Sequence, residues 1–226
     1  MAVNTEAYQS IRQELDAKKV TLVAVSKIQP VEAILKLYES GQRDFGENYV
    51  QEVIEKQAAL PKDIRWHFIG HLQSNKVKYI APFVHLIHGV DSFKLLKEIN
   101  KEAAKNNRVI DVLLQVHIAQ EETKFGLDEN ELNLIIGEFE NLKIPNVQIC
   151  GLMGMASFSD DLEKVRREFR YLKSLFTESA SKFTDHHSSF TILSMGMSGD
   201  YKIAMEEGSN MVRIGSLLFG ARNYVK

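Results

Sequence analysis

The chain has 226 residues, of which 44% are hydrophobic and 26% charged, a composition typical of a soluble globular domain. Its formal net charge is −2, so no general basic field favours nucleic acid, and no apolar run reaches the roughly 18 residues that a membrane span needs. A single cysteine, Cys150, excludes an internal disulfide, and the first residues lack the pattern of a signal peptide, so we expect a cytoplasmic protein.

Short β-rich runs alternate with longer amphipathic segments along the chain. The opening residues predict a helix over roughly 3–18, and the run TLVAVS at 21–26 predicts the first strand. Seven further runs predict strands within 43–48, 65–70, 84–90, 108–119, 146–157, 190–200 and 210–222. Helical patterns fill the intervals, and Ser92 and Asp128 are candidate N-caps for two of the helices.

Strands that alternate with helical crossovers are typical of a parallel sheet. The number of runs and the chain length suit a closed (β/α)8 barrel, or TIM barrel, which typically takes about 250 residues. We therefore expect residues 1–226 to form one α/β domain, with residues 1–19 as an extra helix before the barrel. An open doubly wound sheet is the alternative, but it normally has a glycine-rich first turn, and VSKIQP at 25–30 has none.

Glycine and serine follow the last two predicted strands, at the barrel end where active sites lie. Ser198 and Gly199 follow the seventh run, and Gly215 and Ser216 follow the eighth. Backbone N–H groups at a helix start form an anion site together with a serine hydroxyl, and barrels commonly bind phosphate with these two loops. Either pair alone is better explained as a turn or a helix cap. Their occurrence after adjacent strands favours a phosphate site.

Lys27 follows the first predicted strand, and we expect it about opposite the two phosphate loops. The common alternative for such a lysine is a side chain that extends into solvent. At the end of a barrel strand, however, the side chain points into the mouth, where apolar walls depress its pKa and make it an amine nucleophile. An amine facing a phosphate site suggests an aldehyde that carries a phosphate, and pyridoxal 5'-phosphate has both groups.

Arg213 lies within the apolar run NMVRIG, which predicts that its side chain is buried. A buried arginine needs an acceptor. A salt bridge across the barrel and a hydrogen bond to the pyridine nitrogen of the cofactor explain it equally well. Because arginine keeps its proton, the second interpretation leaves the ring nitrogen unprotonated and the cofactor a weaker electron sink.

Two other features have ordinary interpretations. His67 and His71 are four residues apart, as in a zinc-binding helix, but HFIGH lacks the glutamate of that motif and WHFIG reads as a strand. We therefore expect structural or cofactor-lining histidines and no metal site. Cys150 ends a β-rich run and is expected to be a small core residue.

Several segments resemble the pyridoxal phosphate homeostasis protein family, the stand-alone relatives of the N-terminal barrel of alanine racemase. The resemblance extends over nearly the whole chain. The matching segments are VAVSK at 23–27, DFGENYVQE at 44–52, WHFIGHLQSNK at 66–76, KFG at 124–126, GLM at 151–153 and the long block LSMGMSGDYKIAMEEGSNMVRIGSLLFGAR at 193–222.

The resemblance implies a TIM barrel that binds pyridoxal phosphate and regulates its supply, with no established turnover. By resemblance Lys27 forms the internal aldimine, Arg213 faces the pyridine nitrogen, and the cofactor's phosphate and face are bound by Ser198, Gly199, Gly215, Ser216, Asn48 and His71. The implied partners are pyridoxal phosphate and the apo-enzymes that use it, with the chain a monomer or weak dimer.

One position departs from the family pattern. Many members have a second lysine two residues after the first, and this chain has Gln29 there. A role of that second lysine in cofactor transfer therefore does not carry over. Lys124, in the KFG segment, does match a family lysine and is an alternative amine for transfer.

Two enzymatic functions are the alternatives to a carrier. A pyridoxal phosphate-dependent amino-acid racemase would need a second base, which comes from a second domain in racemases of this type. We expect that domain to be absent, which leaves His71 and Tyr49 as candidates. A phosphosugar enzyme would need a carboxylate near Lys27, for which Glu47 is the candidate at a strand end.

Overall fold

The eight predicted strands form a closed parallel barrel. The structure is a computed structural model that describes residues 3–119, 125–142, 144–183 and 190–220. Each strand pairs with the next, and β1 also pairs with β8, with Thr21 opposite Met211 and Ala24 opposite Ile214. The open doubly wound alternative is therefore wrong. The strands are β1 (Thr21–Val25), β2 (Asp44–Glu47), β3 (Arg65–Phe68), β4 (Leu86–Val90), β5 (Ile110–Val116), β6 (Val147–Gly154), β7 (Ile192–Met197) and β8 (Met211–Ile214).

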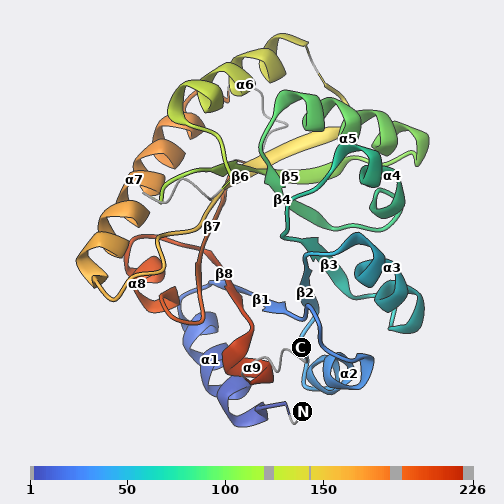
Figure 1. Ribbon diagram of the computed structural model, residues 1–226, viewed down its shortest axis with the longest axis vertical. Helices are drawn as coiled ribbons and strands as arrows, with labels where there is room; N and C mark the ends of the chain where they lie inside the picture. Colours follow the sequence, from blue (N-terminus) through green and yellow to red (C-terminus); the bar gives the residue numbers. More distant parts are fainter. Residues whose placement is uncertain (1–2, 120–124, 143, 184–189, 221–226) are drawn as a thin grey trace.

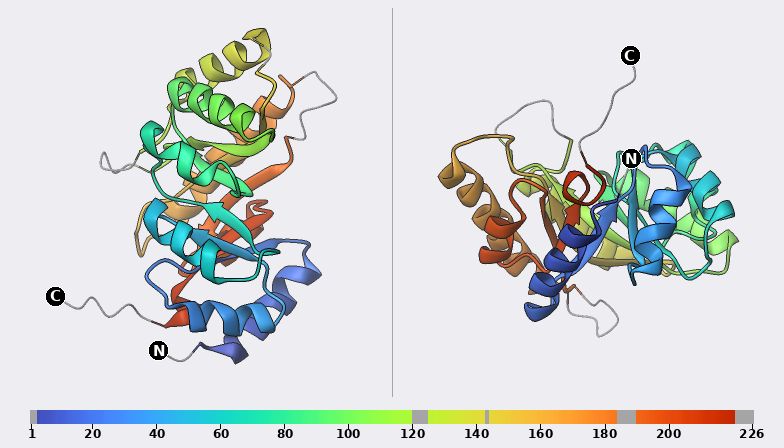
Figure 2. Two further views of the ribbon diagram at one scale, coloured as in Figure 1. Left: turned by 90° about the vertical axis from the view of Figure 1, so that its right-hand side faces the viewer. Right: turned by 90° about the horizontal axis from the view of Figure 1, so that it is seen from below.

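Helices surround this barrel as a ring (Figure 1). The first helix precedes β1 and packs beside the last one, where the Asn4 N–H donates to the Leu218 carbonyl over 2.9 Å. The side views show the helical layer wrapping the strands (Figure 2). The helices are α1 (Thr5–Ala17), α2 (Val31–Glu39), α3 (Val50–Ala59), α4 (Val77–Ile80) after the 3-10 turn η1 (Ser74–Lys76), α5 (Phe93–Lys105), α6 (Glu129–Leu142), α7 (Leu162–Ala180), α8 (Tyr201–Glu206) and α9 (Ser216–Phe219).

Local signals in the sequence fix two of the helix starts. The Ser92 hydroxyl accepts from the Leu95 N–H over 3.3 Å and caps α5. Before α6, Asp128 accepts from the Glu131 N–H and Glu131 accepts from the Asp128 N–H, a reciprocal capping box. Both predicted caps are confirmed. Within the described ranges, no helix combines the length and the apolar character needed to cross a bilayer.

The apolar core has two parts, one between the sheet and the helices and one smaller cluster of buried residues. The smaller cluster contains Val23, Leu86, Leu113, Cys150, Met153 and Met211. Cys150 is 4% exposed, as predicted, and burial raises the pKa of its thiol to about 12. Because side chains alternate along a strand, His88 shares a face with Leu86 and Arg213 shares one with Met211. The interior of the barrel therefore contains polar groups beside the apolar cluster.

Candidate functional site

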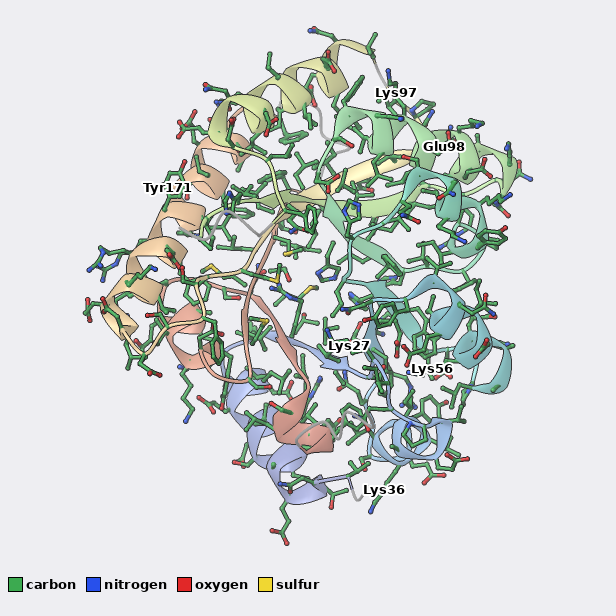
Figure 3. The ribbon with its side chains drawn as sticks, viewed as in Figure 1. Lys27, Lys36, Lys56, Lys97, Glu98 and Tyr171 are labelled. Carbon is green, nitrogen blue, oxygen red and sulfur yellow. The ribbon has the colours of Figure 1, made fainter. Side chains whose placement is uncertain are left out.

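Lys27 lies two residues beyond the end of β1. The strand before it is apolar and buried, which fixes the register of the chain, while the Lys27 side chain is partly buried. Figure 3 shows Lys27 within the ring of helices beside β1 and β2, with Lys56 close by toward α3. The strand end therefore brings this amine to the barrel mouth, as its place in the sequence predicts.

A buried lysine on α3 holds the loop that contains Lys27. The Lys56 ammonium donates to the Ser26 carbonyl over 2.7 Å, to Glu47 over 2.7 Å and to Glu52 over 2.6 Å. Glu52 in turn accepts from the Ile28 N–H over 2.5 Å. The residues on both sides of Lys27 are thus bound by one cluster, which we call the loop clamp: Ser26, Ile28, Glu47, Glu52 and Lys56.

Glu47 has no exposed surface, like Ser26 in the same loop clamp. One of its oxygens accepts from the Ser26 hydroxyl over 2.6 Å and from Lys56, and the other has no hydrogen-bond partner. Burial raises the pKa of Glu47 to about 7, although the charge and hydrogen bond of Lys56 act in the opposite direction. A carboxylate engaged in this way is poorly placed for acid-base work on a phosphosugar.

The ends of β7 and β8 come together beside β1. The Ser198 hydroxyl accepts from the Gly215 N–H over 3.2 Å, and α8 and α9 begin directly after these loops. A Cβ atom on Gly215 would lie 3.3 Å from the Val25 Cβ and carbonyl oxygen, a tight contact, so glycine favours this close approach to β1. At Gly199 a Cβ atom would meet open space, and Ser216 is exposed. The four predicted phosphate residues are therefore neighbours.

This neighbourhood corrects one prediction. We expected Lys27 about opposite the two phosphate loops, but β8 pairs with β1, and Gly215 packs against Val25, two residues before Lys27. A closed barrel makes its first and last strands adjacent, which a linear reading of strand order hides. The phosphate loops thus lie beside the strand that leads to Lys27.

Arg213 is buried inside the barrel, with 4% of its surface exposed, as predicted. Its Nη1 donates to the Ser194 carbonyl over 2.9 Å and to the Ser194 hydroxyl over 2.6 Å, and its Nη2 donates to the Gly154 carbonyl over 3.0 Å. Within the described ranges it forms no ion pair, which argues against the salt-bridge interpretation. Burial lowers the pKa of Arg213 to about 10, partly offset by the charge of Asp200, so the guanidinium stays protonated at neutral pH.

Asn48 and His71 follow β2 and β3 and border one cavity of about 490 Å³. The His71 side chain is 48% exposed, its Nδ1 lies 3.1 Å from an Asp91 oxygen, and its ring stacks on Phe125. The Asn48 side-chain oxygen is buried and has no hydrogen-bond partner. The lining of this cavity comes largely from α3 and from the segment that contains η1 and α4, and it does not include Lys27 or the predicted phosphate residues.

The two histidines of the HFIGH segment do different things. His67 is 1% exposed and its ring nitrogens lie 2.9 Å from Asp44 and 3.0 Å from His88, whereas His71 lies at the mouth. They therefore do not act as a pair. Lys124, the amine suggested for transfer, lies outside the described residues.

Sequence reasoning missed the loop clamp and the role of His88. A signal for the clamp was present, because Val53, Lys56 and Leu60 are spaced as one face of α3 and the other two are buried apolar residues. A lysine on an apolar helix face needs a buried partner. His88 had a similar signal, as a polar residue inside the apolar strand LIHGV.

Comparisons with known proteins place these residues in context. The family "Alanine racemase, N-terminal domain" matches residues 5–223. The pyridoxal phosphate homeostasis protein of Aquifex aeolicus is 45% identical over 205 residues, which cover 90% of this chain and 87% of that protein. The human protein of the same name is 40% identical over 239 residues, which cover 100% of this chain and 86% of the human protein.

Solved structures agree with these matches. PipY of Synechococcus elongatus, solved with pyridoxal phosphate bound, is 36% identical and superposes with a TM-score of 0.85 over 95% of this chain and 99% of its own. Its structure without the cofactor gives a TM-score of 0.89. An alanine racemase from Bartonella henselae gives 0.71 at 16% identity, and this chain covers 62% of it. That last likeness shows the fold alone.

Proposed function

The chain belongs to the alanine racemase N-terminal domain family, and on that premise we propose that it binds pyridoxal phosphate and carries it in the cell, without turnover of its own. The observation that carries the proposal is the packing of Gly215 against Val25. It brings two anion-binding groups, the Ser198 hydroxyl and the Gly215 N–H, beside the strand that leads to Lys27. Relatives named pyridoxal phosphate homeostasis protein, and a PipY structure with that cofactor bound, support it.

The residues of the mouth fit the three polar parts of this cofactor. Pyridoxal phosphate brings an aldehyde that captures amines, a phosphate and a ring nitrogen. Lys27 supplies the amine, and Arg213 donates to the ring nitrogen. Ser198, Gly199, Gly215 and Ser216 hold the phosphate. Asn48 and His71 contact the face of the cofactor.

Arg213 also bears on whether the protein turns over a substrate. A protonated guanidinium that faces the ring nitrogen leaves that nitrogen without a proton, which weakens the cofactor's ability to stabilise a carbanion. The carrier therefore fits better than a broadly active enzyme. The racemase alternative needs a second base, and His71, one of its two candidates, has its Nδ1 beside Asp91.

The partners of the carrier follow from its cargo. We propose apo-enzymes that require pyridoxal phosphate as recipients, a monomer or weak dimer as the working form, and the reducing cytoplasm as its location. Gln29, which is 7% exposed, stands where many relatives have a second lysine. Release by a lysine at that position is therefore excluded for this chain.

The test measures binding and turnover on the same purified protein. We expect one pyridoxal phosphate bound per chain, weaker binding of pyridoxal, which lacks the phosphate, and no inversion of L-alanine or of a broad amino-acid panel. Loss of binding would contradict the proposal. Inversion at a rate that Lys27→Ala abolishes would replace the carrier with the racemase.

A further inference from the structure

A chain of hydrogen bonds leads from Arg213 to the other end of the barrel interior. The Nη1 of Arg213 lies 2.6 Å from the Ser194 hydroxyl, which lies 3.2 Å from Nδ1 of His88. Nε2 of His88 lies 3.0 Å from Nδ1 of His67, and Nε2 of His67 lies 2.9 Å from an Asp44 oxygen. Because β4 and β7 are not neighbouring strands, the bond between His88 and Ser194 must cross the inside of the barrel.

With both imidazoles neutral, one arrangement of the protons satisfies every hydrogen bond in this chain. Arg213 can only donate, so the Ser194 hydroxyl accepts from it and gives its own hydrogen to His88 Nδ1. His88 then donates from Nε2 to His67, and His67 donates from Nε2 to Asp44. Both imidazoles therefore carry their proton on Nε2. The chain donates in one direction throughout, from the guanidinium to the carboxylate.

The charges at the two ends agree with this direction. Burial would raise the pKa of Asp44, but hydrogen bonds from Arg65 and His67 outweigh it and hold that pKa well below its usual value. Asp44 is therefore an anion that only accepts. His88 is fully buried, and burial holds its pKa well below the usual value. It is a neutral imidazole that both donates and accepts.

Arg65 closes the far end of the chain. Its side chain is 48% exposed, and it donates from Nε to one Asp44 oxygen over 2.7 Å and from Nη2 to the other over 2.5 Å. Asp44, His67 and His85 also bring ligand-type atoms within 4.8 Å of one another. Arg65 already occupies both carboxylate oxygens and both nitrogens of His67 are hydrogen-bonded, so the geometry favours a hydrogen-bonded relay over a metal site.

We propose that Ser194, His88, His67 and Asp44 form a positioning relay that holds the Arg213 guanidinium in the orientation needed at the cofactor's ring nitrogen. The inference rests on the proposed function, because it concerns the same site. Arginine has several rotatable bonds, and a side chain that contacts only neutral acceptors nearby is held in place only if those acceptors are themselves fixed. The Ser194 and Gly154 carbonyls are already fixed by the sheet, and the relay fixes the third acceptor, the Ser194 hydroxyl, through two imidazoles that lead to Asp44.

The first measurement uses the protein without cofactor. Nitrogen-15 spectra of labelled histidine at pH 7 should show His88 and His67 as neutral tautomers with the proton on Nε2. Asp44→Asn should disturb both rings, although of the two histidines Asp44 is hydrogen-bonded to His67 and His88 lies one bond further along the chain. The opposite tautomer in the wild type, or an unchanged His88 signal in the variant, would overturn the relay.

The second measurement uses the protein loaded with pyridoxal phosphate. Asp44→Asn and His88→Leu should shift the visible absorption band and weaken cofactor binding about tenfold. Asp63→Asn is the matched control, since Asp63 pairs with Arg43 at an exposed site outside the relay, and it should leave both readouts unchanged. If His88→Leu does not fold, Ser194→Ala carries the test, because it removes one hydroxyl.

The outcomes separate the two proposals. If the wild type binds the cofactor, and the folded relay variants have the same absorption band and affinity as the wild type, the relay alone is contradicted. A wild type that binds no pyridoxal phosphate would contradict the proposed function, and the positioning role with it.

Discussion

Lys56 and Glu47 show how two buried charges position a third group. Removing an ion from water is costly unless it is paired and hydrogen-bonded, and Lys56 makes three such bonds. Two of these lead to the backbone on either side of Lys27, at Ser26 directly and at Ile28 through Glu52. Ile28 has φ of 65°, a conformation that costs about 1–2 kcal/mol for a residue with a side chain. The clamp therefore stabilises a loop that would otherwise relax.

The variant Glu47→Gln tests the loop clamp through the pH dependence of the free energy of unfolding. The pKa of Glu47 is about 7 in the folded state against 4.5 ordinarily, so the folded protein keeps this proton longer than the unfolded chain. The contribution of Glu47 to stability is therefore lost as pH rises from about 4.5 to about 7. Relative to wild type, the glutamine variant should gain about 3–4 kcal/mol over that range, and the difference should stay constant above it.

Urea unfolding at several pH values measures this difference. Glu55→Gln is the matched control, because Glu55 lies exposed on α3, the helix of Lys56, and accepts a hydrogen bond from Gln51. If the difference in unfolding free energy between Glu47→Gln and wild type does not change with pH, the raised pKa of the buried Glu47 carboxyl is contradicted.

Ser198 and Ser216 test the phosphate loops. Replacing both by alanine removes the two hydroxyls that we propose as donors to the cofactor's phosphate, and a hydrogen bond to a charged group contributes about 1.5–3 kcal/mol. We expect each loss to raise the Kd for pyridoxal phosphate by tenfold or more, with little effect on pyridoxal. Ser181→Ala, at the end of α7, is the control. Equal affinity of the double variant and wild type in a fluorescence titration would exclude these hydroxyls as phosphate ligands.

At this scale the sequence predicts a residue's place better than its partners. Lys27 follows the end of β1 and Arg213 is buried within β8, as the sequence predicts, because strand periodicity and strand ends are local properties. The contacts of Lys56, His88 and Asp44 join segments far apart in the chain, so no local pattern shows which of them meet. Their only signal is a polar residue at an apolar position.

At the scale of elements, β6 shows how a glycine sets the register of a sheet. Pairing with β5 shifts between Ile149 and Gly151, which leaves Cys150 as the extra residue of a bulge. Gly151 has φ of 150°, and a Cβ atom there would lie 1.8 Å from the Ile192 carbonyl oxygen of β7. The sequence predicts a strand here but not its bulge, because a bulge depends on the neighbouring strands.

Gly151→Ala should therefore be severely destabilising, by more than about 4 kcal/mol, since neither strand can move without breaking the barrel. Gly137→Ala is the matched control, because Gly137 is in α6 with nothing within 4 Å of a Cβ atom, and it should stabilise by about 0.5–1 kcal/mol. Thermal unfolding of the two variants checks this. Similar melting temperatures would contradict the expected clash between a side chain at position 151 and the backbone of β7.

At the scale of the whole molecule, closure of β8 onto β1 builds the site from the two ends of the chain. Alternation of strands and helices was enough to predict the barrel, since parallel strands need crossovers and eight of them close. It was not enough to place Lys27 relative to the phosphate loops, because adjacency across the closure is absent from the linear order. A ligand that bridges β1, β7 and β8 should therefore stabilise the entire barrel.

Cofactor binding should raise the melting temperature accordingly. At a free concentration one hundred times Kd, pyridoxal phosphate should add about 2.7 kcal/mol to the free energy of unfolding, which corresponds to roughly 5–10 °C for a chain of this length. Lys27→Ala should show a smaller increase at the same concentration. A melting temperature independent of the cofactor, measured by calorimetry, would contradict binding to the folded barrel.

The most direct test is to reduce the protein with borohydride in the presence of pyridoxal phosphate and locate the product by peptide mass spectrometry. A stable adduct on Lys27, absent from Lys27→Ala and undiminished in Lys36→Ala, is the predicted result. An adduct confined to other lysines, or none at all, would contradict the assignment of Lys27 as the cofactor-binding amine.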